Sequence, residues 1–366
     1  MSLPILKKNG IREIDFTIDD EGTDYLKRSW KNYIKSLAPY PESKYNGRGI
    51  VMCAGGIKYF TCAWIAIKQL RAIGCKLIVE LWFLGDELSE EVVNQLETLN
   101  VVCKNFRDHL TTELDGVMLK PLAIVHSQFK DVLFLDADNN CVKDPSYLFD
   151  TKEYLQNGAV FWPDYWKTAP DNPIWQIVDS QNYNTNEQES GQLVINKHLC
   201  WKEINLCLFF NENHAIYHKL LLGDKDTFKF AWIALKSKFF MIKKEVAICG
   251  FVKSGRFFGT TMVQHSPTGD ILFLHRNLLK WDVTKLDEYV WEKIKEFKHD
   301  AILKEYNSQR FLMDISGEIL FYDAPVAVRN MEKYCLAILK QLRESDFYAR
   351  FLTYIYIMEQ RSIRFN

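Results

Sequence analysis

Asp136 and Asp138 follow an apolar run at residues 132–135, and Ala137 separates them. In an extended segment alternate side chains point to the same side, so the two carboxylates can face one ion or one ribose. Burying two carboxylates at a strand end is costly unless a cation neutralises them, and a hard divalent cation with oxygen ligands does so. This spacing predicts a metal site, with a pair of exposed turn aspartates as the simpler alternative.

A second candidate group follows the apolar run at residues 271–274. His275 ends this run, so its imidazole can complete the shell of a metal held by carboxylates, and Arg276 or Lys280 can reach a phosphate. His265 is a rival ligand, and a histidine with a purely structural role is the default interpretation.

Further carboxylates are expected on loops. Glu189 lies in a polar segment before the apolar run at 193–195, whereas Asp224 and Asp226 precede a predicted helix at 228–235. An acid near a helix start also stabilises the helix through its dipole and free amides, so spacing alone does not separate a catalytic from a structural Asp226.

The elements that must position these residues alternate between strand and helix. Strands are predicted at 50–54, 76–84 and 131–135, and helices at 61–73, 89–99 and 121–129. The run at 132–135 lacks polar interruptions, which indicates a strand buried on both faces, as in a parallel sheet. An α/β fold of this kind binds ligands beyond the carboxyl ends of its strands.

The chain divides into three predicted regions. Residues 1–46 are a polar lead-in segment, residues 47–282 form the catalytic domain, and residues 283–366 form a mostly helical C-terminal extension. Short apolar runs after residue 159 continue the sheet of the catalytic domain and do not start a new one.

Composition excludes several classes of function. The 366 residues carry 46 Lys and Arg against 47 Asp and Glu, so no basic field is available for a nucleic acid. No dinucleotide fingerprint or P-loop is present.

Nine scattered cysteines without a zinc spacing indicate reduced core thiols. No run of about 20 apolar residues predicts a membrane span, so we expect a cytoplasmic chain, or a Golgi-lumenal one if the sequence is truncated.

Seven stretches, taken in order, resemble the fungal-type α-mannosyltransferases of glycosyltransferase family 71, in particular its α-1,3-mannosyltransferase-like members. These stretches are GRGIVMCAGG (47–56), LKP (119–121), VLFLDADN (132–139), FWPDYW (161–166), ESGQ (189–192), GDKDTF (223–228) and HRN (275–277). The resemblance implies a GT-A type glycosyltransferase fold, which has a Rossmann-like mixed, mainly parallel sheet. It also implies Mn²⁺, with Mg²⁺ possible, and transfer of mannose from GDP-mannose to a glycan or glycoprotein with retained anomeric configuration.

The resemblance also assigns roles to residues. Metal ligands are expected to be Asp136, Asp138 and His275, and either Glu189 or Asp226 is the expected catalytic carboxylate. Residues expected to bind the nucleotide sugar are Cys53, Ala54, Gly55, Lys120, Asp136, Ala137, Asp138, Gly191, Gln192, Asp224 and Lys280. A covalent and a front-face retaining mechanism are both open.

Two other functions are open at this point. One is a glycosyltransferase of the same fold that uses a UDP-sugar. The other is a non-catalytic glycan-binding module in which sugars stack on the aromatic rings of Trp162, Tyr165, Trp166 and Trp175.

Overall fold

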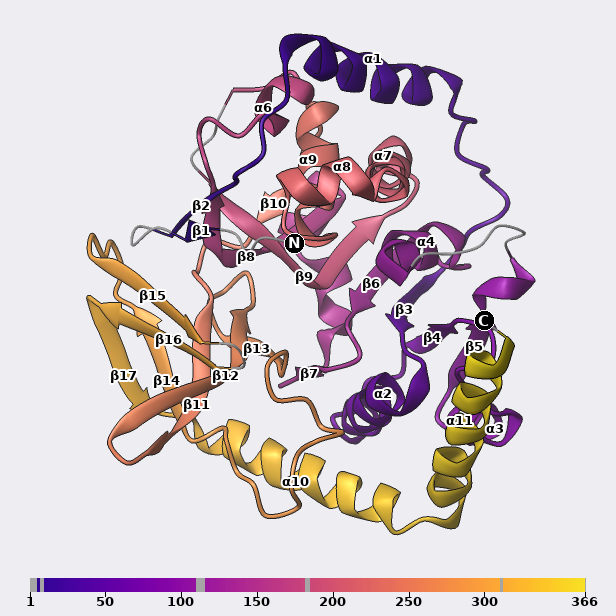
Figure 1. Cartoon of the computed structure of the whole chain (residues 1–366). Helices are drawn as coiled ribbons and strands as arrows, with labels where there is room; N and C mark the ends of the chain where they lie inside the picture. Colours follow the sequence, from indigo (N-terminus) through magenta and orange to yellow (C-terminus); the bar gives the residue numbers. More distant parts are fainter. Residues whose placement is uncertain (1–4, 7–9, 110–115, 182–184, 310–311, 366) are drawn as a thin grey trace.

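The computed structural model describes residues 5–6, 10–109, 116–181, 185–309 and 312–365. In this part of the chain two β-sheets lie side by side, and helices cover both faces of the larger one (Figure 1).

The larger sheet has nine strands among the described residues and is mixed but mainly parallel. Its order is β1-β2-β8-β9-β6-β3-β4-β5, with β10 beside β8. The bounds are β1 (Ile5–Leu6), β2 (Ile11–Glu13), β3 (Arg48–Cys53), β4 (Ile78–Phe83), β5 (Val101–Asn105), β6 (Asp131–Leu135), β8 (Ala159–Thr168), β9 (Asn186–Asn196) and β10 (Phe240–Met241). Strands β6, β3, β4 and β5 are parallel neighbours, whereas β9 runs antiparallel between β6 and β8. The predicted α/β class is confirmed.

Side chains on β3 alternate between two hydrophobic layers, because Ile50 and Met52 point to one face and Val51 to the other. The first face packs against α2 (Gly56–Ala72), α3 (Glu90–Glu97), α5 (Lys152–Asn157), α10 (Val326–Arg343) and α11 (Asp346–Phe365). The second face packs against α1 (Asp20–Ser36), α4 (Leu119–His126), α6 (Ile174–Ile177), α7 (Trp201–Glu212), α8 (His214–Leu220) and α9 (Lys225–Ala234). The result is a three-layer sandwich. Its parallel strands are buried on both faces, as the sequence predicted for residues 132–135.

The second sheet is antiparallel and has eight strands among the described residues. Its order is β15-β16-β12-β11-β14-β17, and β13 pairs with both β12 and β7. The bounds are β7 (Asn139–Cys141), β11 (Ala247–Lys253), β12 (Arg256–His265), β13 (Ile271–His275), β14 (Lys293–Phe297), β15 (Lys304–Gln309), β16 (Leu312–Gly317) and β17 (Ile319–Asp323).

The helices expected in the C-terminal extension are present as α10 and α11, but the four strands β14 to β17 precede them. The sequence pattern did not predict these strands. They are short and partly exposed, so they alternate too weakly to be distinguished from polar loops.

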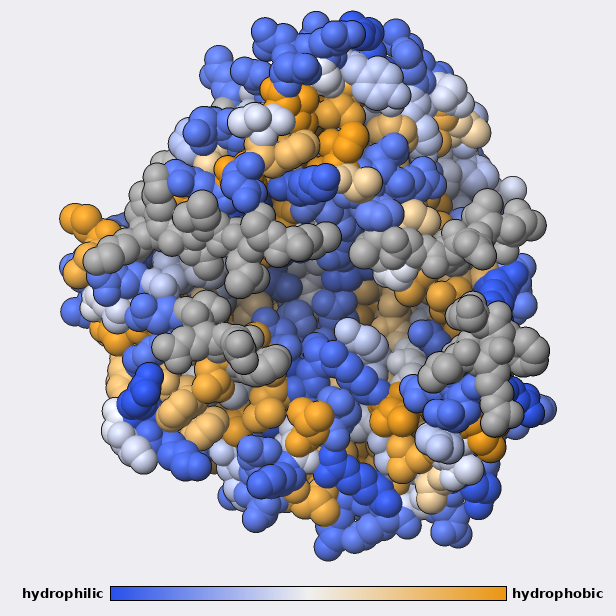
Figure 2. Space-filling model, viewed as in Figure 1, coloured by the Kyte–Doolittle hydropathy of each residue, from blue (hydrophilic) through white to orange (hydrophobic). Residues whose placement is uncertain are grey.

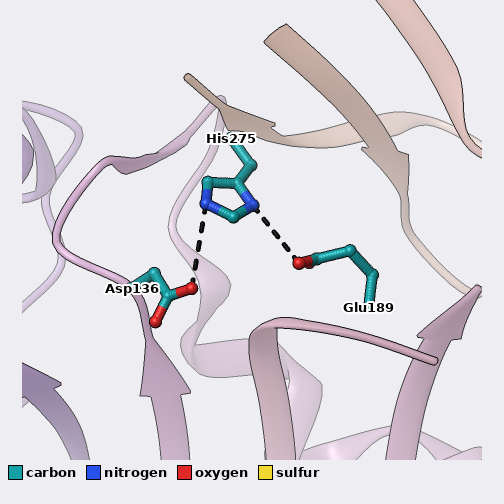
Figure 3. A group of neighbouring side chains, drawn as sticks. All are labelled: Asp136, Glu189 and His275. Atoms are coloured by element: carbon teal, nitrogen blue, oxygen red, sulfur yellow. Dashed lines mark ion pairs between the residues drawn. The ribbon is translucent and has the colours of Figure 1, made fainter. Parts of the chain in front are cut away.

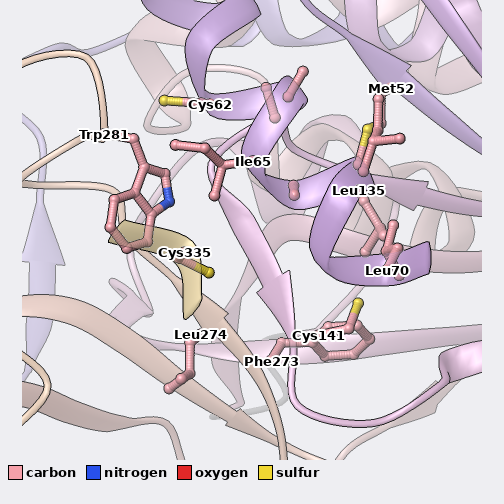
Figure 4. Close-up of a cluster of buried hydrophobic side chains, with 14 of the residues drawn as sticks. Met52, Cys62, Ile65, Leu70, Leu135, Cys141, Phe273, Leu274, Trp281 and Cys335 are labelled. Atoms are coloured by element: carbon pink, nitrogen blue, oxygen red, sulfur yellow. The ribbon is translucent and has the colours of Figure 1, made fainter. Parts of the chain in front are cut away.

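One hydrophobic cluster joins the two sheets. Figure 4 shows Leu135 of β6 and Ile65 of α2 in the same cluster as Phe273 of β13 and Cys335 of α10. All nine cysteines are free thiols, in agreement with the prediction. No helix in the described ranges combines the length and apolar character that crossing a membrane would need.

Candidate active site

A cavity of about 640 Å³ opens at the carboxyl ends of three neighbouring parallel strands. Residues 53–55 line it at the end of β3, Phe83 and Glu87 line it at the end of β4 and in the turn that follows, and residues 136–138 line it after β6. The space-filling view shows hydrophilic residues gathered in a hollow near the middle of this face (Figure 2). This is the edge of the sheet at which α/β proteins bind ligands.

Strand pairing brings His275 to the two aspartates. Strand β7 begins directly after Asp138, and β13 pairs with it so that His275 lies opposite Asn139. The Nε2 atom of His275 lies 3.2 Å from Asp138 Oδ1 and 3.8 Å from Asp136 Oδ2. The sequence placed these three residues in one group, and the fold assembles that group from both sheets.

Glu189 reaches the same group from the other side. It lies on strand β9 and not on a loop as expected, because β9 pairs with β6 and places Gln192 opposite Leu135. Glu189 Oε1 lies 3.5 Å from Nδ1 of His275, so the imidazole is held between Glu189 and Asp136 (Figure 3). A side chain at position 191 would strike His275, which explains the glycine there.

The pair formed by His275 and Glu189 is strongly polar although it is buried. Burial opposes the charge on each group, but the attraction between the two groups outweighs it. The pKa of Glu189 therefore falls to about 2, and the pKa of His275 rises above its usual value. Glu189 also accepts hydrogen bonds from the Gly191 N–H (2.7 Å) and from Gln192 Nε2 (3.3 Å). These contacts fix the carboxylate firmly beside the ring.

Two lysines neutralise the two aspartates. Lys120 Nζ lies 3.1 Å from Asp136 Oδ1 and 3.4 Å from Asp224 Oδ2, and Lys280 forms an ion pair with Asp138. Burial would lower the pKa of Lys120, but attraction to Asp136 and Asp224 raises it above the usual range. Both lysines line the cavity, so they stand within reach of a bound anion.

The donor atoms of this group suit a hard divalent cation. Asp136, Glu189 and His275 each offer a ligand atom within 4.8 Å of the others, and Asp138 adds a further oxygen. Carboxylate oxygens with one imidazole fit Mn²⁺ or Mg²⁺. Asp136 and Asp138 face Nε2, whereas Glu189 faces Nδ1. One ion could therefore contact Asp136, Asp138 and Nε2 of His275, while Glu189 orients the imidazole ring from its Nδ1 side.

Most of the other residues predicted from the sequence also gather here. The predicted residues that line the cavity are Cys53, Ala54, Gly55, Lys120, Asp136, Ala137, Asp138, Asp224, His275 and Lys280. Gln192 lies behind them, where its side chain contacts Asn139 and Glu189.

The structure does not place Asp226, one of the two carboxylates expected to be catalytic, at the cavity. It is fully buried, accepts a hydrogen bond from the Gln188 N–H at 2.9 Å, and pairs with Lys229 at 3.2 Å. It does not line the cavity. Residues two apart at the start of a helix point in roughly opposite directions, so Asp224 faces the cavity while Asp226 faces the core.

Two other cationic candidates lie away from the cavity. Arg276 is buried and pairs with Glu332 of α10 at 3.0 Å, so it is not placed to reach a phosphate. His265 is buried, burial lowers its pKa to about 3, and it is not among the residues that line the cavity. Among the two predicted histidines, the geometry favours His275.

Several cavity residues were not found from the sequence. They include Tyr59, Glu87, His218 and Asn277. Glu87 follows β4 at the same edge of the sheet, so the rule that located Asp136 would have found it if applied to the strand predicted at 76–84. Tyr59 and His218 come from helices α2 and α8, which no motif linked to this edge.

The mainly parallel sheet and the metal-compatible cavity at its strand ends define this protein as an α/β protein with the architecture of a GT-A type glycosyltransferase. Residues 47–188 and 179–266 match the protein family described as "Mannosyltransferase putative", and the chain belongs to this family. The resemblance to fungal-type α-mannosyltransferases is thereby confirmed.

Relatives with similar sequences carry mannosyltransferase names. The chain is 28% identical to "Alpha-1,2-mannosyltransferase MNN21" of Candida albicans, over 84% of this chain and 54% of that protein. It is 29% identical to "Alpha-1,2-mannosyltransferase MNN2" of Saccharomyces cerevisiae, over 66% of this chain and 49% of that protein. The chain thus spans about half the length of these relatives.

Solved structures show more distant similarity. Mouse xyloside xylosyltransferase 1 gives a TM-score of 0.38 with 16% identity, over 53% of this chain and 84% of that one. The mannosyltransferase Ktr4p from S. cerevisiae gives a TM-score of 0.32 with 11% identity, over 59% of this chain and 76% of that one.

Proposed function

We propose that this chain is a divalent-metal-dependent α-mannosyltransferase that transfers mannose from GDP-mannose to a glycan hydroxyl with retained anomeric configuration. The observation that carries the proposal is the convergence of Asp136, Asp138 and His275 Nε2 at the cavity. Membership of the mannosyltransferase family supports mannose as the transferred sugar. The names of the relatives favour an α-1,2 linkage over the α-1,3 linkage first expected.

In this proposal Asp136, Asp138 and His275 hold Mn²⁺ or Mg²⁺, with Glu189 as the residue that orients the imidazole. The bound cation would neutralise the negative charge of the diphosphate leaving group. Lys120 and Lys280 bind the same phosphates, because both ammonium groups line the cavity beside the aspartates.

Two further features of the chain assist the reaction. Helix α2 begins after Gly55 at the cavity, so its N-terminal amides favour a bound phosphate. Positive charge develops on the sugar ring as the glycosidic bond breaks, and Asp224 is a carboxylate of the cavity that can stabilise it. Asp224 takes the place that the sequence analysis offered to Asp226.

The structure counts against a glycan-binding module. The four rings that would form its stacking platform, Trp162, Tyr165, Trp166 and Trp175, are only 0 to 8% exposed. Trp162 packs edge-to-face on Phe273 and donates a hydrogen bond to the backbone of His265. These rings belong to the core and do not offer a face to a sugar.

A donor panel tests the proposal. Purified protein is incubated with GDP-mannose or UDP-sugars, an α-mannoside acceptor, and either MnCl₂ or a chelator. We expect release of GDP and an α-linked product only with GDP-mannose and metal. Release of UDP alone would favour the UDP-sugar alternative, and no nucleotide release from any donor would contradict the proposal.

Asp138→Asn provides the matched variant, because it removes one charge with little change in shape. Transfer should fall to the background level while the melting temperature stays near that of the original chain. Asp270→Asn serves as the control, because Asp270 is exposed and lies outside the cavity.

A further inference from the structure

The cavity continues beyond the candidate metal site, across the ends of β3 and β4. The strand order β6-β3-β4 places the residues after β4 two strand spacings from Asp136 and Asp138, or roughly 10 Å at about 4.8 Å a strand. If the diphosphate lies at the aspartates, as in the proposed function, the nucleoside can extend along this edge toward β4.

Glu87 is the carboxylate at the β4 end of the cavity. Its Oε2 accepts a hydrogen bond from the Leu84 N–H at 2.8 Å, which closes the turn after β4. The carboxylate also lies against Gly55, where any side chain would collide with it. These contacts hold the group in one place on the cavity wall, half-buried beside the first turn of α2.

The surroundings of Glu87 suit a flat base with donors on its edge. Phe83 and Leu119 line the same cavity with apolar atoms. Burial raises the pKa of Glu87, and hydrogen-bond donors from a ligand would offset that cost of desolvation. A carboxylate only accepts hydrogen bonds, and its two oxygens can receive two parallel donors.

We propose that Glu87 selects the nucleobase of the donor by accepting the two neighbouring donors of guanine, N1–H and the 2-amino group. Uracil presents one N–H between two carbonyl oxygens, and both carbonyls are repelled by a carboxylate. This inference rests on the proposed function and deepens it, because it names the residue that makes the enzyme specific for a guanine nucleotide.

Calorimetric titration with three nucleotides tests the inference. GDP, inosine diphosphate and UDP are each titrated into the full chain with MnCl₂ present. Inosine diphosphate is the critical probe because it differs from GDP only by lacking the 2-amino group. We expect GDP to bind about tenfold or more tightly than either of the others.

Glu87→Gln is the informative variant, because its amide oxygen can still accept the Leu84 N–H while the carboxylate is lost. GDP affinity should fall about tenfold or more, with UDP affinity little changed. Asp86→Asn is the matched control, since Asp86 stands on the same turn, pairs with Arg107 at the surface and does not line the cavity. The melting temperature without nucleotide checks that each variant is folded.

The other outcomes overturn the inference in distinguishable ways. An equal loss of affinity for all three nucleotides in Glu87→Gln would assign Glu87 to the ribose or to the turn. Unchanged GDP binding in this variant, or equal binding of GDP and inosine diphosphate by the original chain, would remove the base contact while leaving the proposed function intact. Binding of UDP in preference to GDP by the original chain would overturn both the inference and the proposed donor.

Discussion

The two ring nitrogens of His275 face different carboxylates, and this difference separates the roles of the acids around it. Asp136 and Asp138 approach Nε2 at the cavity wall, whereas Glu189 approaches Nδ1 from behind the ring. A carboxylate in that second position fixes the tautomer and direction of a ligating imidazole. Glu189 is thus better placed to position His275 than to attack a sugar.

Glu189→Gln tests this assignment. A positioning role predicts that the affinity for Mn²⁺ falls about 10- to 100-fold and that activity recovers in part at high Mn²⁺. Titration of transfer rate against Mn²⁺ measures both effects. A nucleophile would behave differently, because its loss would abolish transfer at every Mn²⁺ concentration without changing the affinity for the metal.

Lys197 provides a prediction about pH that is independent of the active site. Its side chain is fully buried and donates to the Ser127 carbonyl at 2.6 Å, and burial lowers its pKa from 10.5 to about 6. Between these pH values the unfolded chain binds a proton that the folded chain does not. The free energy of unfolding should therefore rise with pH, by up to about 1.4 kcal/mol for each pH unit.

Urea denaturation of the original chain and of Lys197→Met at pH 7 and pH 9 isolates this contribution. The rise with pH should be smaller in Lys197→Met by up to about 3 kcal/mol over the two units. Lys202→Met, on the exposed face of α7, should keep the original slope. Identical slopes in all three proteins would show that Lys197 stays charged in the fold.

At the level of elements, the sequence located β3 and β6 because an uninterrupted apolar run marks each of them, at residues 50–54 and 132–135, and residues of the cavity lie at the end of each run. Asp136 was placed correctly for this reason. Glu189 was not, since its strand β9 carries polar residues and its register on β6 depends on a long-range pairing that no local pattern encodes. The contact between β7 and β13 that delivers His275 is equally non-local.

Helix α10 supports the loop that carries Lys280. Glu332 accepts hydrogen bonds from the backbone N–H groups of Val290 and Trp291 and pairs with buried Arg276. Arg276 in turn donates to the Leu279 carbonyl at 2.6 Å. Removal of one partner from a buried ion pair leaves an unpaired charge in the core.

Glu332→Ala should therefore lower the free energy of unfolding by about 3–5 kcal/mol. Glu344→Ala is the matched control at the end of the same helix, because Glu344 forms an exposed pair with Lys340 and its loss should cost about 1 kcal/mol or less. Chemical denaturation measures both changes. A small loss in Glu332→Ala would mean that solvent reaches Arg276 and that α10 does not hold the loop.

Across the whole molecule, the C-terminal residues share the main hydrophobic core with the larger sheet. Leu339 of α10 and Phe351 of α11 belong to the same cluster as Ile65 of α2. The Thr61 hydroxyl lies 2.7 Å from the Tyr348 hydroxyl, and Gln69 Nε2 lies 3.3 Å from the sulfur of Met331. From these contacts we propose that the C-terminal helices α10 and α11 belong to the same folding unit as residues 47–282.

A chain that ends at Asp282 tests this view against the boundary predicted from the sequence. It loses more than ten buried apolar side chains of the shared cluster, each contributing about 1.5–3 kcal/mol, and this sum exceeds the stability of a typical domain. We expect no cooperative thermal unfolding from such a chain. A folded, nucleotide-binding protein ending at Asp282 would restore the predicted boundary and make the C-terminal helices an accessory to the site.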